Sequence, residues 1–104
     1  MTLGTWTVVL EADRVDEDDV VGYRFYSGSV AQPPDVPQSA GNPQKTMVLE
    51  SVESTIPVAT FGVTAVDNGG LESLRTDLSV RLDADAPTKP GALRLVSAVF
   101  VPAG

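Results

Sequence analysis

The sequence predicts an all-β protein: an antiparallel β-sandwich of six or seven short strands. Several segments alternate apolar and polar residues with a period of two, which is typical of strands with one buried face. Turn-forming residues, mainly Gly, Pro, Asn and Asp, separate these segments at short intervals. No stretch repeats its apolar residues with a helical period, so almost no helix is expected.

The clearest strand and turn lie between Thr60 and Ser73. One face of the strand carries Phe61, Val63 and Ala65. The following Asp67-Asn68-Gly69-Gly70 consists of residues that accept positive φ, the strongest short-range signal of a hairpin. The partner strand is expected over residues 74–82, where one face carries Leu78, Val80 and Leu82.

Three earlier segments are also expected to be strands. In residues 5–12, the inward face carries Trp6, Val8, Leu10 and Ala12. After a charged loop at 13–19, residues 20–26 form a strand with one face made of Val21, Tyr23 and Phe25. The third segment covers residues 45–52, where Met47 and Leu49 share a face.

Proline residues indicate where the connections between the strands lie. Residues 27–44 contain four prolines, which favours a long connection or a ragged edge segment because proline cannot donate to a ladder: Pro33, Pro34, Pro37 and Pro43. Residues 53–59 are expected to form a crossover connection, in which Pro57 prevents a regular ladder of backbone hydrogen bonds. Residues 83–91 have the composition of a linker, and a last strand follows at 92–101.

Composition excludes several classes of function. The 104 residues suffice for one domain with a real core. Cysteine and histidine are absent, which removes disulfides, a thiolate nucleophile, the usual general base and the commonest metal ligand. A net charge of −7 repels nucleic acid, and no apolar run is long enough to cross a bilayer. We expect a protein that is not an enzyme, holds no cofactor, and neither binds nucleic acid nor inserts into a membrane.

The segments resemble parts of a fibronectin type III domain. Residues 61–73 (FGVTAVDNGGLES) look like its strand F, the F–G turn and the start of strand G. Residues 21–25 (VGYRF) look like its strand C, and residues 8–12 (VVLEA) like its strand B. The resemblance covers most of the chain and implies an immunoglobulin-like, fibronectin type III-like antiparallel β-sandwich.

The sequence also departs from that family. Phe61 stands where the family usually has a tyrosine, and Trp6 lies earlier than the core tryptophan, so we expect it to fill the core from a shifted position. A segment resembling the linker and strand A, residues 86–96, follows the other strands instead of preceding them. The domain is circularly permuted, or this segment completes a neighbouring copy, or the chain ends inside a second repeat.

These readings divide the chain into a fibronectin type III-like sandwich at 1–82 (strands B to G), a linker at 83–91, and a C-terminal strand at 92–104. That last strand is expected to cover an edge of the same or a neighbouring subunit, since an unpaired edge invites aggregation. The candidate interface residues are Leu93, Leu95, Val99, Phe100 and Val101. The alternative is a strand that is simply buried on both faces.

Two other segments are candidate sites. No metal site is predicted; the only weak candidates for a calcium ion are in the acidic loop: Asp16, Asp18 and Asp19. We favour a solvated loop, because the ligand spacing and glycine of an EF-hand are missing. The proline-rich segment 32–43 is either a partner-binding loop or a flexible surface insertion.

The function expected from these features is a non-enzymatic structural or interaction module with protein partners, in a homo-oligomer or a virion. The context we favour is a bacteriophage virion component, such as a head decoration, tail or fibre protein, assembled in the host cytoplasm and linking subunits through its C-terminal strand. The alternative is a carbohydrate- or surface-binding accessory module of a secreted bacterial protein, which would be extracellular or at the cell surface.

Overall fold

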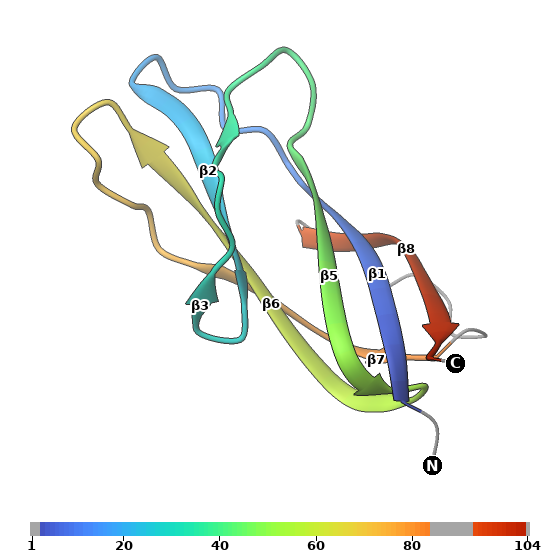
Figure 1. Cartoon of the computed structure of the whole chain (residues 1–104). Helices are drawn as coiled ribbons and strands as arrows, with labels where there is room; N and C mark the ends of the chain where they lie inside the picture. The colour runs from blue at the N-terminus through green and yellow to red at the C-terminus, as the bar shows by residue number, and fades with distance from the viewer. Residues whose placement is uncertain (1–2, 84–92, 104) are drawn as a thin grey trace.

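Two antiparallel sheets pack face to face in the computed structural model, which describes residues 3–83 and 93–103 (Figure 1). The strands are β1 (Leu3–Ala12), β2 (Val20–Ser27), β3 (Val30–Ala31), β4 (Val36–Pro37), β5 (Gln44–Glu53), β6 (Ile56–Asp67), β7 (Thr76–Leu82) and β8 (Leu93–Pro102). The smaller sheet has the order β5-β1-β8; the larger has the order β3-β2-β6-β7, with β4 also paired to β2. The described residues contain no helix, so the predicted all-β antiparallel sandwich is confirmed.

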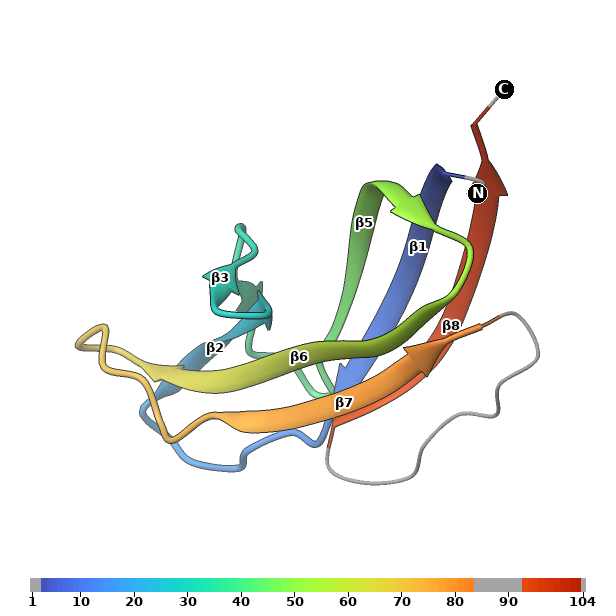
Figure 2. The same ribbon diagram turned by 90° about the horizontal axis from the view of Figure 1, so that it is seen from below.

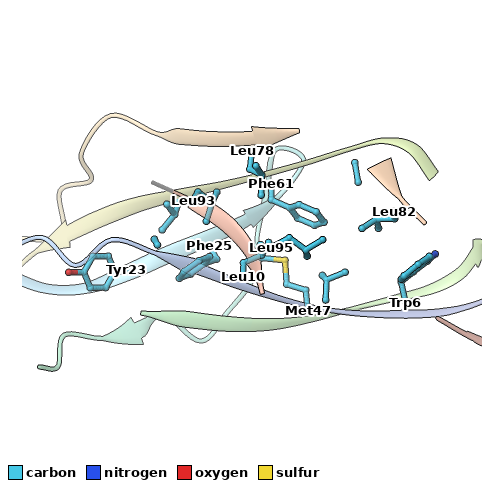
Figure 3. Close-up of a cluster of buried hydrophobic side chains, with 14 of the residues drawn as sticks. Trp6, Leu10, Tyr23, Phe25, Met47, Phe61, Leu78, Leu82, Leu93 and Leu95 are labelled. Carbon is cyan, nitrogen blue, oxygen red and sulfur yellow. The ribbon is translucent and has the colours of Figure 1, made fainter. Parts of the chain in front are cut away.

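The core lies between the sheets (Figure 3), and β1 is the central strand of the smaller sheet. The alternation predicted for this strand is confirmed, because its inward side chains are all buried: Trp6, Val8, Leu10 and Ala12. Trp6 is fully buried, and its indole Nε1 donates to the carbonyl oxygen of Glu53 at 2.9 Å, so burial leaves no polar atom of the ring unpaired. Burial of Val8 and of Leu10 contributes roughly 1.5–3 kcal/mol each.

One predicted face was wrong at the start of β2. Tyr23 and Phe25 are buried as expected, but Val21 is half exposed and Val20 is buried in its place. The register between β2 and β6 shifts between Val20 and Gly22, which moves the following residues to the other side of the alternation. A period of two cannot reveal such a bulge.

The segment 27–44 contains two short strands rather than one open connection. β3 pairs with the end of β2, and β4 pairs with its middle, opposite Gly22 and Tyr23. Pro37 belongs to β4, where proline is tolerated because the strand lies at the edge of the sheet.

The crossover predicted at 53–59 is shorter than expected. Only Ser54 and Thr55 separate β5 from β6, and β6 continues through Pro57. The pairing of β6 with β7 shifts register between Ile56 and Ala59, so Pro57 falls in an irregularity. The pairing of β6 with β2 begins only at Phe61, so this end of β6 has one neighbouring strand.

The last strand, β8, pairs antiparallel with β1 of the same chain along its whole length (Figure 2). The register places Leu95 opposite Leu10 and Phe100 opposite Trp6. The amide of Ala103 donates to the carbonyl oxygen of Leu3 at 3.0 Å and extends the ladder past the strand. Of the predicted linker, Asp83 is described; residues 84–91 lie outside the described residues.

Candidate interaction surface

The inner face of β8 belongs to the core of its own chain. Leu93 and Leu95, two of the candidate interface residues, are 2% and 8% exposed and pack in the cluster between the sheets. Phe100 is half-buried, and its ring centroid lies 5.4 Å from that of Trp6. These three side chains fix β8 to the domain, so a partner-binding surface on β8 excludes the two leucines.

A bulge turns the rest of β8 relative to its first residues. The pairing of β8 with β1 shifts register between Val9 and Leu10, which leaves Val96 as an extra residue between Leu95 and Ser97. Beyond the bulge, Val99 and Val101 point outward and are 57% and 59% exposed. Two of the five candidate interface residues are therefore available to a partner on the outer face.

Over its central rows, the outer face of the smaller sheet is uncharged on β1 and β8, and on β5 at Thr46 and Val48; Glu50 follows on β5, where the pairing with β1 shifts register. The paired residues form the rows Thr46–Val9–Ser97, Val48–Thr7–Val99 and Thr5–Val101. We call these eight residues the uncharged face. In a chain with a net charge of −7, an uncharged surface of this kind is suited to contact with protein.

Charged groups anchor the beginning of β8. Arg94 donates through Nε to Glu11 at 2.7 Å and through Nη1 to Asp13 at 2.9 Å. Hydrogen bonds from Gln44 and from Arg94 hold the pKa of the Glu11 carboxyl below its usual range. These contacts join β8, β1 and β5 at one end of the smaller sheet, so charged and polar side chains border the uncharged face there.

The edge of β8 away from β1 is open among the described residues, where no strand pairs with it. A hollow of about 520 Å³ runs beside this edge, lined by Ser54, Thr55, Asp83, Ala98, Val99, Phe100 and Pro102. No residue of β1 lines it, which agrees with its position on the unpaired side of β8. The open edge and the hollow together could receive another extended segment.

The acidic loop holds no cluster suited to a cation. Asp16 accepts a hydrogen bond from Arg14 at 3.0 Å, and the carbonyl oxygen of Asp19 accepts one from the amide of Asn68 at 2.9 Å. Asp18 is exposed. Across residues 3–83 and 93–103, no group of three or more acidic side chains is placed to hold a metal ion.

The proline-rich segment is tied to both sheets: to β2 of the larger sheet through backbone bonds, and to Lys45 on β5 of the smaller sheet. The backbone N–H of Gln32 donates to the carbonyl oxygen of Phe25 at 2.8 Å, and that of Gln38 donates to the carbonyl oxygen of Val21 at 2.9 Å. Lys45 Nζ donates to the carbonyl oxygen of Pro34 at 2.8 Å. These contacts leave its role as a partner-binding loop a prediction.

Sequence reasoning missed a polar network on the outer face of the larger sheet. Glu72 accepts hydrogen bonds from Tyr26 and, at 2.8 Å, from Thr64, and pairs with Arg24 at 3.2 Å. Arg24 also forms a two-pronged contact with Asp35 at 2.8 and 3.0 Å. The alternation of β2 places Arg24 and Tyr26 outward, but Glu72 comes from a loop, where no period gives its direction.

Comparison with known proteins leaves the assignment to physical argument: no family model, curated protein or solved structure matches the chain. Within the part of the chain that the structure describes, no helix is long and apolar enough to cross a membrane.

Proposed function

We propose that the protein is a non-enzymatic structural and interaction module, a bacteriophage virion component that links subunits through its C-terminal strand β8. A head decoration, tail or fibre protein of this kind assembles in the host cytoplasm. This function requires contacts with other proteins, and we do not propose that any side chain of the chain catalyses a reaction.

The observation that carries the proposal is the character of β8. One face of this strand packs against its own domain, while the other is uncharged beyond Arg94 and ends in half-exposed valines. Long apolar edge strands are normally protected by charge, proline or a covering segment, because they pair readily with other chains. An edge that no strand of the described residues covers is suited to joining subunits.

The order of the strands supports the fibronectin type III-like type of sandwich. If β1 corresponds to strand B and β8 to strand A, the smaller sheet should hold strand B between A and E, and β1 does lie between β8 and β5. The strands compared with C, F and G are β2, β6 and β7, which are neighbours in that order in the larger sheet. This arrangement favours a circularly permuted domain among the three explanations.

Deleting β8 is a poor test of its role. Removing the strand would expose the core contacts of Leu93 and Leu95, so loss of assembly could follow from loss of the fold. A substitution on the exposed face avoids this problem. Val99→Lys adds a charge where β8 meets a partner, and Val21→Lys is a matched control, because Val21 is a half-exposed valine on the other sheet.

The proposal is tested in the phage that encodes the chain. Mass spectrometry of purified particles should detect the protein, and particles carrying Val99→Lys should lose it or fail to assemble, whereas Val21→Lys particles should be normal. Particles that retain the Val99→Lys chain would refute linkage through β8. Absence of the unmodified chain from particles would refute the virion assignment and favour an accessory module of a secreted protein.

A further inference from the structure

We infer that the partner of β8 is a second copy of this chain. In this arrangement the two β8 strands pair antiparallel about a twofold axis at Val99, so that Ala98 of each copy lies opposite Phe100 of the other. The smaller sheets of the two copies then form one continuous six-stranded sheet. The inference rests on the proposed role of β8 in linking subunits, and adds the partner and the register.

The ladder with β1 fixes which backbone groups of β8 face outward. The amide of Ala103 bonds to Leu3, and in an antiparallel pair the bonded residues alternate. Val101, Val99 and Ser97 therefore direct their backbone groups toward β1, while Ala98 and Phe100 direct theirs to the open edge. Pro102, which has no N–H, occupies an edge-facing position, as this alternation requires.

The backbone N–H groups and carbonyl oxygens of Ala98 and Phe100 determine which register is favoured. With Ala98 opposite Phe100 of the second copy, both N–H groups and both carbonyl oxygens of each edge find partners. With Phe100 opposite itself, Ala98 meets Pro102, whose missing N–H leaves the Ala98 carbonyl oxygen unpaired. Because unpaired backbone groups are costly once water is excluded, the first register is favoured.

Among the strand edges of the described residues, the β8 edge would meet a second copy with the least electrostatic repulsion. Residues 95–103 contain no ionisable side chain, in a chain with a net charge of −7. The β5 and β7 edges carry charged side chains: Lys45, Glu50 and Glu53 on the former, Asp77 and Arg81 on the latter. The remaining edge consists of β3 and β4, two residues each, with Pro37 in the latter. Two acidic copies therefore meet with least repulsion through β8.

The proposed register also matches the side chains. On the outer side, Val99 meets Val99 of the second copy, and Ser97 meets Val101, so the uncharged face continues across the axis. On the inner side, the hollow of about 520 Å³ beside Ala98 and Phe100 leaves space for the incoming strand. No ionisable side chain stands at these paired positions. Asp83, which also lines the hollow, would face a strand whose residues 95–103 are uncharged.

Disulfide trapping tests the register, because the chain contains no cysteine. Across the twofold axis, the Cα atoms at position 99 would form a non-hydrogen-bonded pair about 4.5 Å apart, within the range that a disulfide spans. Val99→Cys should therefore oxidise to a covalent dimer. Ser97→Cys alone and Val101→Cys alone should not, because each lies four residues, roughly 13 Å, from its own symmetry mate. A mixture of the two variants should crosslink with each other.

Charge variants test whether the contact is edge-to-edge. In analytical ultracentrifugation the unmodified chain should be a dimer and Val99→Lys a monomer, because two lysines would meet at the axis. Val48→Lys should remain a dimer, since Val48 lies on the same uncharged face but on β5. Dissociation by Val48→Lys would indicate stacking of faces and overturn the edge pairing, as would Val99→Cys crosslinking no better than Ser97→Cys.

The inference and the proposed function fail in different ways. A monomeric chain without Val99→Cys crosslinking, whose Val99→Lys variant is still lost from particles, would show that β8 joins a different protein; the second copy is then refuted and the linking role stands. A dimer trapped at position 99 together with particles that lack the chain would refute the virion role and leave the paired edge in place.

Discussion

The outer faces of the two sheets differ in how they meet solvent. On the larger sheet, Arg24, Tyr26 and Glu72 form a network in which each polar group is paired within the chain. On the smaller sheet, the uncharged face presents only Thr, Ser and Val. Both faces belong to antiparallel sheets of the same sandwich, so the difference lies in the side chains and not in the architecture. It indicates that the larger sheet is completed by its own loops, while the smaller one is suited to an outside partner.

The two sheets also use glycine differently. A Cβ on Gly4 would lie 2.3 Å from the backbone oxygen of Val101, so the absence of a side chain lets the end of β8 approach β1. A Cβ on Gly62 would lie 2.0 Å from Arg75 Nε, whose guanidinium carbon lies 4.9 Å from the centre of the Tyr26 ring. A side chain at Gly4, in the smaller sheet, would therefore collide with rigid backbone. A side chain at Gly62, in the larger sheet, would collide with the flexible side chain of Arg75.

The largest effect should come from opening the core under β8. Leu95→Ala removes a buried side chain and should lower the free energy of unfolding by about 2–4 kcal/mol. Urea denaturation measures this loss. Val99→Ala, on the same strand but exposed, should change stability by about 0.5 kcal/mol or less. Equal losses in the two variants would contradict the division of β8 into an inner and an outer face.

The glycine comparison should give the next effect. Gly4→Ala forces backbone apart and should cost about 1–3 kcal/mol, as overpacking does elsewhere. Gly62→Ala should cost less, because Arg75 can rotate away from Tyr26 at the loss of a cation–π contact of about 0.5–1 kcal/mol. Thermal or urea unfolding of both variants gives the order. A more destabilising Gly62→Ala would mean that Arg75 is held more firmly than β8.

The network on the larger sheet should make a smaller, pH-dependent contribution. Hydrogen bonds from Tyr26 and Thr64, together with Arg24, lower the pKa of Glu72. A carboxyl whose pKa is lower in the folded than in the unfolded state stabilises the fold above its unfolded pKa, about 4.3 for glutamate, and this contribution is lost as the pH falls through the folded pKa. Glu72→Gln should therefore cost about 1 kcal/mol at pH 7 and less at pH 3.

Unfolding of the unmodified chain and of Glu72→Gln, each at both pH values, measures this difference. Glu50→Gln serves as a control, since Glu50 is an exposed acid on β5 of the other sheet, outside the Glu72 contacts. A Glu72→Gln penalty that stays constant with pH would show that shape, and not charge, accounts for the effect.

The smallest effect is expected on the uncharged face. Thr46 is exposed on β5, in a row with Val9, so Thr46→Lys should change the free energy of unfolding by about 0.5 kcal/mol or less. Urea denaturation checks this expectation. A large loss would indicate that the face contributes to folding, and would weaken the view that it is kept uncharged for a partner.

Periodicity predicted the strands well where the ladder is regular. The four inward residues of β1 and the buried pair Leu78 and Leu82 of β7 lie where alternation places them. Irregular pairing defeated it at Val21, where a register shift changes which side the residue faces. At Pro57 the irregular pairing agrees with the interrupted ladder expected from proline. A bulge depends on how two strands meet, and neither strand alone records it.

For the candidate interaction surface, the sequence named five residues of one strand, β8, and whether they meet a partner stays a prediction. The apolar run at the end of β8 indicated an edge-covering strand, but it did not separate Leu93 and Leu95, which are buried, from Val99 and Val101, which are exposed. The uncharged face was not visible in the sequence, since its three rows combine residues from β1, β5 and β8.

The amino-acid sequence by itself determined the all-β class, the inward face of β1 and the scarcity of chemically reactive groups, because these follow from local alternation and composition. Only the tertiary structure decided that β8 pairs with β1 of its own chain, that its bulge turns Val99 outward, and that Glu72 closes a network across the opposite sheet. Those outcomes depend on contacts between residues far apart in the chain, whose register is set by the packing of the whole sandwich.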